Sequence, residues 1–188
     1  MSKLKISRRK FLIGVSSFVA TAATPAFVAS SLSTIKPQFS SKKLSLYNVH
    51  TGEDFEGIYW RAGHYDEKAL GRLADLLRDR RNNQKHPIDA HLFDLLHKLQ
   101  STLGTKEFYT VICGYRSPQT NAALRKLSNG VAKNSLHLKG KAIDIRLEHT
   151  SLKELCQAAR SLKAGGVGYY PKSKFVHVDI RPKPAFWT

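Results

Sequence analysis

The sequence is poor in cysteine and has no long apolar run. Its 188 residues contain two cysteines, Cys113 and Cys156, and neither belongs to a CxxC pair. A thiolate zinc site and a redox dithiol motif therefore have no support. No apolar stretch approaches the ~20 residues of an ordinary transmembrane helix, and no internal repeat or heptad pattern is present. We expect two buried free thiols, because free cysteine packs as a small apolar residue; a single disulfide is the alternative.

Acidic residues are also scarce. The chain has 14 of them against 31 lysines and arginines, a net charge of +17. The first 30 residues hold five basic residues and no acidic one, so the remaining 158 hold 26 basic and 14 acidic residues, a net charge of +12. This excess favours an anionic partner such as nucleic acid, a wall polymer or lipid headgroups. Lysines scattered over a solvated surface produce the same total.

The first 30 residues have the pattern of an export signal. Basic residues up to Lys10 precede a weakly apolar run, Phe11 to Ala23, and small residues follow around Pro25. This arrangement is typical of a cleavable signal. The string Ser7-Arg8-Arg9-Lys10-Phe11-Leu12 is similar to a twin-arginine signal, which would engage the twin-arginine translocon. A basic disordered arm is the alternative, but it would not need the apolar run.

We therefore predict three parts of the chain: a twin-arginine signal peptide over residues 1–30, a linker over 31–43, and one folded domain over 44–188. A domain of this length can bury a core of ordinary size. Export would place it in the periplasm or cell envelope, where it would meet anionic wall polymers rather than nucleic acid. We expect a monomer, although the sequence does not determine the oligomeric state.

Segments of strand character alternate with amphipathic helices, which predicts a single α+β domain with a mainly antiparallel sheet, packed helices and a cleft on the exposed sheet face. The glycine-rich stretch 164–168 is expected to form a tight return. Pro182 and Pro184 are expected to end regular strand pairing. Phe186 and Trp187 would then fold back and pack. The expected strands are 44–49, 55–60, 107–113, 141–147 and 175–180, and the expected helices begin at Asp66, near Pro87, at Ser117 and at Ser151.

Two histidines and an aspartate fall on positions that can converge. Alternate side chains of a strand share a face, so Asp144 lies opposite the aliphatic face of its strand, and His177 and Asp179 lie opposite that of the last strand. If both strands belong to one sheet, Asp144 and His177 can meet, and His137 can reach them through a bend at Gly140. Two imidazoles and a carboxylate are a ligand set of catalytic zinc with one open position. A single histidine is more often structural, but this combination favours a metal site.

Three further residues are candidates for contact with a substrate. Arg116 follows a strand at a strand-to-helix corner, where its side chain can point into a cleft or form a salt bridge with the loop. Tyr169 and Tyr170 precede the last strand and can line the cleft or pack in the core. The residues themselves leave both pairs of alternatives open.

Three motifs carry a resemblance to a known group of enzymes. The segments Gly114-Tyr115-Arg116-Ser117, Ser135-x-His137-x6-Asp144 and His177-x-Asp179 are similar to those of the zinc D-alanyl-D-alanine peptidases, which include VanX, VanY and hedgehog-type domains. More narrowly, the chain resembles the YcbK-like (MepK-type) murein endopeptidase family from about Leu44 to Trp187. The resemblance implies the zinc cleft of that superfamily, with His137, Asp144 and His177 as ligands.

The resemblance also implies roles around the metal. Arg116 would bind the substrate carboxylate or carbonyl and stabilise the developing oxyanion. Many relatives have an acidic residue three positions before the last histidine, but here that position is Lys174. Asp179 would then either accept the proton of the attacking water or hold His177 in place. Both roles stay open.

The implied function is a zinc metallopeptidase that hydrolyses amide bonds in peptidoglycan stem peptides or crosslinks during cell wall remodelling. The bond could be the D-alanine to diaminopimelate crosslink or the direct diaminopimelate crosslink. It could also be a terminal D-alanine bond, which would make the protein a D-alanyl-D-alanine carboxypeptidase. The rivals are a non-catalytic, zinc-stabilised peptidoglycan-binding module and a polyanion-binding protein with incidental histidines.

Overall fold

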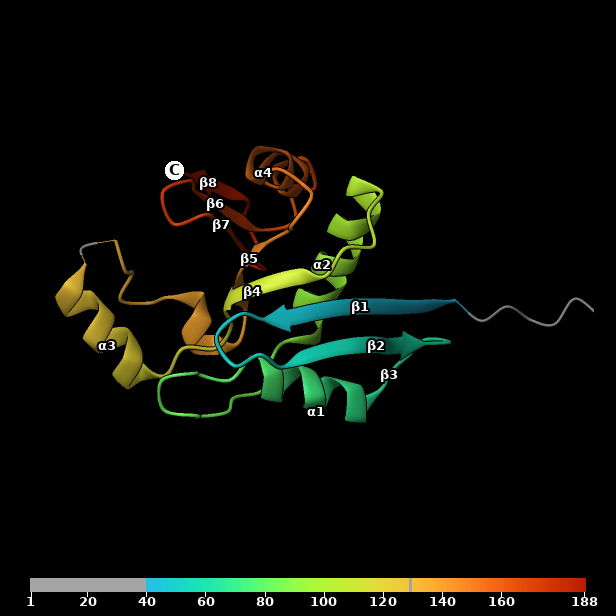
Figure 1. Ribbon diagram of the computed structural model, residues 1–188, viewed down its shortest axis with the longest axis horizontal. Coiled ribbons are helices and arrows are strands. Elements are labelled where there is room, and N and C mark those ends of the chain that lie inside the picture. The colour runs from blue at the N-terminus through green and yellow to red at the C-terminus, as the bar shows by residue number, and fades with distance from the viewer. Residues whose placement is uncertain (1–39, 129) are drawn as a thin grey trace, which may run out of the picture. The chain divides into compact units, whose positions relative to one another are not determined.

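A mainly antiparallel sheet organises residues 40–128 and 130–188, the part of the chain that the computed structural model describes (Figure 1). Its strands are β1 Ser41–Asn48, β2 Asp54–Arg61, β3 His64–Tyr65, β4 Tyr109–Cys113, β5 Ala142–Arg146, β6 Gly166–Tyr170, β7 Phe175–Asp179 and β8 Ala185–Trp187. They are ordered β3-β2-β1-β4-β5-β7-β6-β8, and only the pairs β1–β4 and β6–β8 of this described sheet are parallel. The predicted α+β fold is therefore confirmed.

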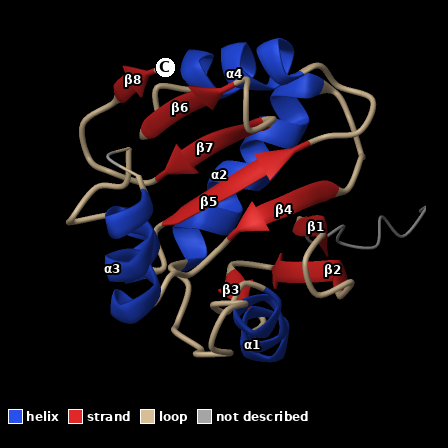
Figure 2. Ribbon diagram, turned by 60° about the vertical axis from the view of Figure 1, so that its left-hand side comes forward, coloured by secondary structure: helices blue, strands red, loops and turns tan. Residues whose placement is uncertain are grey.

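Helices cover one face of this sheet (Figure 2). The helices that pack on this face are α1 Glu67–Leu76, α2 Ala90–Leu103 and α4 Leu152–Ser161, whereas α3 Pro118–Leu127 and the 3-10 turn η1 Leu136–Lys139 contribute no residue to the hydrophobic core. Figure 2 shows α2 and α4 behind strands β4 to β7. Leucines of α1, α2 and α4 form the hydrophobic core with Ile143 and Ile145 of β5 and with Val176 and Val178 of β7. Because strand side chains alternate, Asp144, between the two isoleucines, and His177, between the two valines, lie on the opposite face.

The helix starts follow the chemistry expected from the sequence. The side chains of Asp66, Ser117 and Ser151 accept hydrogen bonds from N–H groups in the first turns of α1, α3 and α4, as N-cap residues do. The helix expected to start near Pro87 begins at Ala90. Its N-cap is Asp89, whose carboxylate accepts a hydrogen bond from the N–H of the second residue of the helix.

Two segments that were predicted to be irregular are strands. A tight return was expected over 164–168, but β6 begins within that stretch, at Gly166, and pairs antiparallel with β7. Phe186 and Trp187 lie in β8, which pairs in parallel with β6, so the prolines interrupt only the connection between β7 and β8. Glycine has little strand propensity, yet β6 requires Gly168, because a Cβ atom there would lie 2.5 Å from Trp187 Nε1.

The predicted N-terminal parts lie almost entirely outside the described residues. The signal peptide expected over residues 1–30 falls there, as does most of the linker expected over 31–43. β1 begins at Ser41 and not at the predicted domain start, Leu44, because its first residues already pair with β2. No helix within the described ranges has both the length and the apolar character needed to cross a membrane.

Candidate metal centre

A row of side chains crosses the polar face of the sheet. Cys113 in β4 lies opposite Asp144 in β5, and Asp144 lies opposite His177 in β7. Side chains in such cross-strand pairs are close enough to interact. The predicted placement of Asp144 and His177 on one shared face is therefore confirmed.

The turn before β5 adds His137 to this row. Ser135 caps the turn by accepting a hydrogen bond from the His137 N–H, and Gly140 ends it with a φ of +61°. A Cβ atom at Gly140 would collide with the backbone carbonyl of Pro87, so glycine is required for both conformation and space. The His137 ring is oriented by a 2.7 Å hydrogen bond between Nδ1 and the Gly114 carbonyl.

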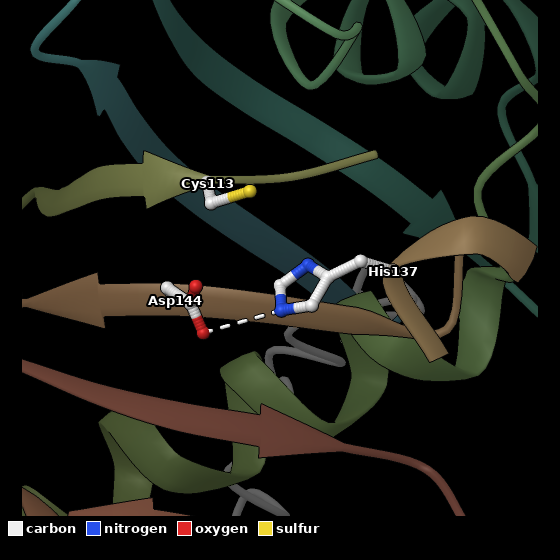
Figure 3. Close-up of side chains that lie close together, drawn as sticks. All are labelled: Cys113, His137 and Asp144. Carbon is white, nitrogen blue, oxygen red and sulfur yellow. Dashed lines mark ion pairs between the residues drawn. The ribbon is translucent and has the colours of Figure 1, made fainter. Parts of the chain in front are cut away.

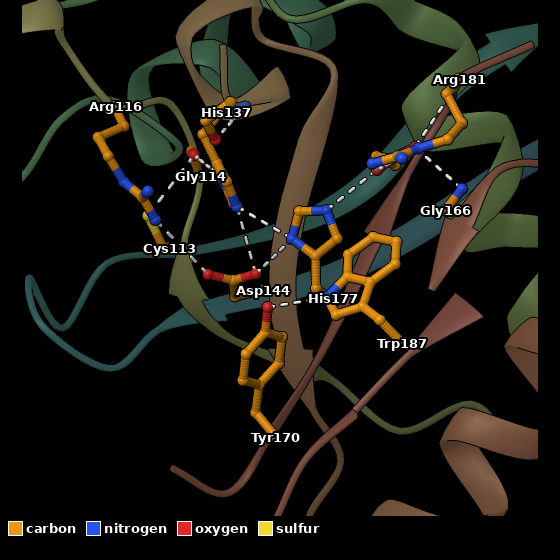
Figure 4. A network of polar contacts seen from close by, with 12 residues as sticks. Cys113, Gly114, Arg116, His137, Asp144, Gly166, Tyr170, His177, Arg181 and Trp187 are labelled. Atoms are coloured by element: carbon orange, nitrogen blue, oxygen red, sulfur yellow. Dashed lines mark hydrogen bonds and ion pairs between the residues drawn. The ribbon is translucent and has the colours of Figure 1, made fainter. Parts of the chain in front are cut away.

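Three ligand-type atoms converge where the row meets His137 (Figure 4). His137 Nε2 lies 3.1 Å from His177 Nδ1 and 3.3 Å from Asp144 Oδ1, and the last two atoms are 2.8 Å apart. In a tetrahedral zinc site with bonds of ~2.0 to 2.2 Å, ligand atoms are separated by about 3.3 to 3.6 Å. All three residues are buried. The cluster is therefore close to the size that a metal ion requires.

The outer nitrogens of the two imidazoles determine what the inner nitrogens can do. His137 Nδ1 faces the Gly114 carbonyl, and His177 Nε2 lies 3.2 Å from Asp179 Oδ2. A carbonyl or carboxylate oxygen can only accept, so each outer nitrogen carries the ring hydrogen of a neutral imidazole. The inner nitrogens then direct lone pairs at each other and at Asp144 Oδ1. Such a cluster repels itself unless a proton or a metal cation occupies its centre, so these residues can hold a metal ion.

The charges of the metal-free cluster are consistent with this geometry. Burial opposes protonation of His137, but the negative charge of Asp144 outweighs it and raises the pKa of His137 to about 10. Burial likewise opposes ionisation of Asp144, but His137 and His177 hold the pKa of its carboxyl well below the usual range. The metal-free protein thus keeps a proton where a metal ion would otherwise bind.

Metal binding to this cluster should therefore become tighter as the pH rises. Because the pKa of His137 is about 10 in the metal-free protein, binding at pH 6 to 8 displaces one proton. The metal association constant should then increase about tenfold per pH unit. Competition against a chelator, corrected for the protonation of the chelator, measures the slope. Calorimetry in two buffers with different heats of ionisation should give one proton released, and an association constant that is independent of pH would contradict the expectation.

Cys113 is a member of this neighbourhood that the sequence analysis did not include. Its sulfur and ligand-type atoms of His137 and Asp144 lie within 4.8 Å of one another (Figure 3). Strand alternation would place Cys113 in the core beside Val111, but a register shift between these two residues turns Cys113 to the polar side, as a β-bulge does. Both thiols are free, as expected, but the expected burial holds for Cys156 alone, because Cys113 is only half-buried.

Arg116 extends toward the cluster. Its Nη2 lies 4.0 Å from Asp144 Oδ2 and 3.7 Å from the Cys113 sulfur, and its Nη1 donates to Asn121 Oδ1 at 3.3 Å. Its Nε is buried and finds no acceptor among the described residues. Of the two alternatives for Arg116, the structure therefore has the one in which the side chain points to the cleft.

Asp179 lies behind His177, on the side away from Asp144. It is fully buried and accepts hydrogen bonds from the Gly166 N–H at 2.9 Å and from the Arg181 guanidinium at 2.6 Å, besides its contact with His177 Nε2. Burial alone would raise the pKa of Asp179, but these hydrogen bonds hold it well below the usual range. Both oxygens of this carboxylate are thus occupied by protein groups.

A cleft of about 780 Å³ opens onto the cluster, and all three clustered residues contribute to its lining. Three arginines line it as well: Arg81, Arg116 and Arg181. Asp144 is the only carboxylate among the lining residues in the described part of the chain. This excess of positive charge favours an anionic ligand.

The two tyrosines at the end of β6 point to opposite sides of the sheet. Tyr170 lines the cleft with Phe175 and Trp187, whereas Tyr169 packs against the hydrophobic core. Of the two alternatives left open by the sequence, Tyr170 therefore has the cleft position and Tyr169 the core position, because adjacent side chains of a strand alternate. Trp187 was expected to fold back and pack, and its ring centroid lies 5.4 Å from that of His177.

Comparison with known proteins places this geometry in a family. Residues 36–186 match the family model described as "Peptidoglycan L,D-endopeptidase MepK". The chain belongs to the MepK family. It is 44% identical to the peptidoglycan L,D-endopeptidase MepK of Escherichia coli strain K12 over 184 residues, which cover 97% of this chain and 98% of that protein. It is 41% identical to the probable peptidoglycan L,D-endopeptidase MepK of Haemophilus influenzae over 183 residues, 97% and 96% of the two chains.

The MepK match includes every part of the site. Its range, 36–186, extends from before β1 into β8 and contains the cluster, Arg116 and Asp179. The resemblance predicted from the arginine motif and the two histidine motifs is therefore confirmed at the level of the family.

Proposed function

We propose that this chain is a zinc-dependent peptidoglycan endopeptidase that hydrolyses an internal amide bond between an L and a D centre. The observation that carries the proposal is the convergence of His137 Nε2, His177 Nδ1 and Asp144 Oδ1 within 3.3 Å at a cleft. Membership of the MepK family and the names of the relatives supply the reaction and the substrate class.

His137, Asp144 and His177 would hold the zinc ion. Two imidazole nitrogens and one carboxylate oxygen suit this borderline-soft cation, and three protein ligands leave a position open. When bound, zinc supplies a Lewis acid for the substrate carbonyl and lowers the pKa of bound water toward neutrality. The donor set and its size support zinc on chemical grounds.

Arg116 would stabilise the reacting carbonyl group. Its guanidinium lies beside Asp144 at the cleft, and its Nε has no acceptor among the described residues. A fixed cation aimed at the carbonyl oxygen lowers the energy of the negative charge that develops there. Arg116 can also bind a carboxylate of the peptide, as the positive lining of the cleft favours.

Asp179 would be a positioning residue and not the proton acceptor. Its position behind His177 and its two occupied oxygens leave it no access to a water molecule in the cleft. A carboxylate that holds the outer nitrogen of a metal-bound imidazole fixes its tautomer and orientation. The geometry thus favours the second of the two roles considered for Asp179.

The place of action would be the periplasm or cell envelope. The twin-arginine string and the apolar run over residues 1–30 support export of the folded protein by that route. Peptidoglycan, the substrate named for the relatives, lies outside the cytoplasm and is consistent with this location.

The proposal is tested by treating purified, crosslinked muropeptides with the wild type and with His177→Ala, and by measuring products by mass and zinc by elemental analysis. We expect the wild type to retain about one zinc ion and to divide crosslinked peptides at an L,D bond. His177→Ala should lose both properties, and the matched control His149→Ala, at an exposed position, should keep both. Zinc retention without turnover would indicate a binding module. Release of terminal D-alanine alone would indicate a carboxypeptidase.

A further inference from the structure

One hydroxyl group in the cleft has a free hydrogen. Tyr170 Oη accepts a 2.8 Å hydrogen bond from Trp187 Nε1. In residues 40–128 and 130–188, no acceptor lies within hydrogen-bonding distance of this hydroxyl. Figure 4 shows the hydroxyl end of Tyr170 directed toward Asp144 and His177. A phenol that accepts from an indole can still donate its own hydrogen, and here the open side of the hydroxyl is the cleft.

The sheet register builds this arrangement. Gly168 lies opposite His177 on one side and opposite Trp187 on the other. A Cβ atom on Gly168 would lie 2.5 Å from Trp187 Nε1 and 2.7 Å from Tyr170 Cε2. Because Gly168 has no side chain, the indole of Trp187 has room to contact both His177 and the hydroxyl of Tyr170.

Further contacts hold both rings in place. Tyr170 stacks on Phe175 with centroids 4.6 Å apart. Trp187 packs against His177, and the Arg181 guanidinium lies 4.9 Å from the centroid of its indole ring. A hydroxyl held this firmly has little orientational freedom to lose when it donates to a ligand, which is what preorganised catalytic donors require.

We infer that Tyr170 is a further catalytic residue, which donates a hydrogen bond to the carbonyl oxygen of the scissile amide, and that Trp187 is the residue that positions it. The inference rests on the proposed function. As the water oxygen bonds to the carbonyl carbon, the π electron pair moves onto the carbonyl oxygen, and the Tyr170 O–H and Arg116 stabilise that charge. The pair returns when the C–N bond breaks, and the leaving nitrogen takes up the proton that the attacking water gives up, so that the water supplies OH to the carbonyl carbon and H to the nitrogen. Tyr170 keeps its own proton throughout.

The decisive variant is Tyr170→Phe, which keeps the ring and its stacking on Phe175. Removing one oxyanion donor should lower kcat by about 10² to 10³-fold, with KM and bound zinc unchanged within about twofold. The control Tyr169→Phe, on the core side of the same strand, should match the wild type. Unchanged kcat would overturn the inference, as would a raised KM with unchanged kcat. Wild type without turnover would instead show that the proposed function itself fails.

A second measurement does not depend on turnover. The chain has two tryptophans, Trp60 and Trp187, so two indole N–H resonances are expected by NMR. In Tyr170→Phe the resonance of Trp187 should shift and its hydrogen exchange should accelerate, while Trp60 serves as the internal reference. Identical indole spectra of the variant and the wild type would overturn the assigned contact.

The positioning role of Trp187 is tested by Trp187→Phe, which keeps an aromatic ring but removes the N–H donor. Alone it should lower kcat by about tenfold and leave KM unchanged. Combined with Tyr170→Phe it should cause no further loss in kcat, because the two residues act through one hydroxyl. Losses that multiply in the double variant would show that Trp187 acts independently and would overturn its role as the positioning residue.

Discussion

Asp144→Asn is expected to lower peptidoglycan hydrolysis by at least ~10³-fold, about 4 kcal/mol of transition-state stabilisation, and to remove stoichiometric zinc. Asp144 lies at the centre of the row, and its Oδ1 faces the inner nitrogens of both His137 and His177. It is also the only carboxylate among the described residues that line the cleft. Asparagine keeps the shape but supplies no negative charge to bind a cation. Elemental analysis after dialysis and a muropeptide assay measure the two losses.

Two comparisons make the Asp144 result specific. The exposed Asp75, which pairs with Lys85, supplies the matched control Asp75→Asn, and we expect it to keep zinc and activity. In metal-free Asp144→Asn, the pKa of His137 should fall far below its wild-type value of about 10, because burial then acts without the opposing charge. An Asp144→Asn protein that retained zinc and turnover would show that the metal lies elsewhere.

The convergence of the cluster could be predicted because it depends on strand alternation alone. The aliphatic residues of β5 and β7 identify the core face, which leaves Asp144 and His177 on the other face. The pairing of these two residues then follows once β5 and β7 are neighbours, as the register has them. The bend at Gly140 and the N-caps of the helices could also be predicted, because each depends only on the local backbone chemistry.

The unpredicted features depend on contacts between distant segments. The β-bulge that turns Cys113 toward the cluster changes register by one residue and leaves no signature in a strand-like sequence. β8 pairs in parallel with β6, and no turn motif in the sequence indicates this pairing. Gly168 was read as part of a turn, although its function in the sheet is to leave space for Trp187. The grouping of Tyr170, Phe175 and Trp187 along the cleft could therefore not be predicted from the sequence.

Asp179→Asn should separate the two roles that the sequence left open for Asp179. In the wild type, the carboxylate can only accept from His177 Nε2, so the inner Nδ1 of a neutral ring keeps its lone pair. An asparagine can present its NH₂ group instead. The ring hydrogen would then move to Nδ1 and block the nitrogen that faces Asp144. We expect zinc affinity to fall by about 10 to 100-fold, measured by chelator competition, with a loss of activity at limiting zinc.

The response to added zinc decides between positioning and proton transfer. If Asp179 holds His177, excess zinc should restore much of the lost activity, because mass action refills a weakened site. If Asp179 were the proton acceptor, Asp179→Asn would bind zinc as the wild type does and remain slow at saturating zinc. The contacts of Asp179 with Gly166 and Arg181 favour the first outcome, since they occupy both oxygens of the buried carboxylate. Full zinc occupancy with a low kcat in Asp179→Asn would contradict the positioning role and show that Asp179 acts in proton transfer.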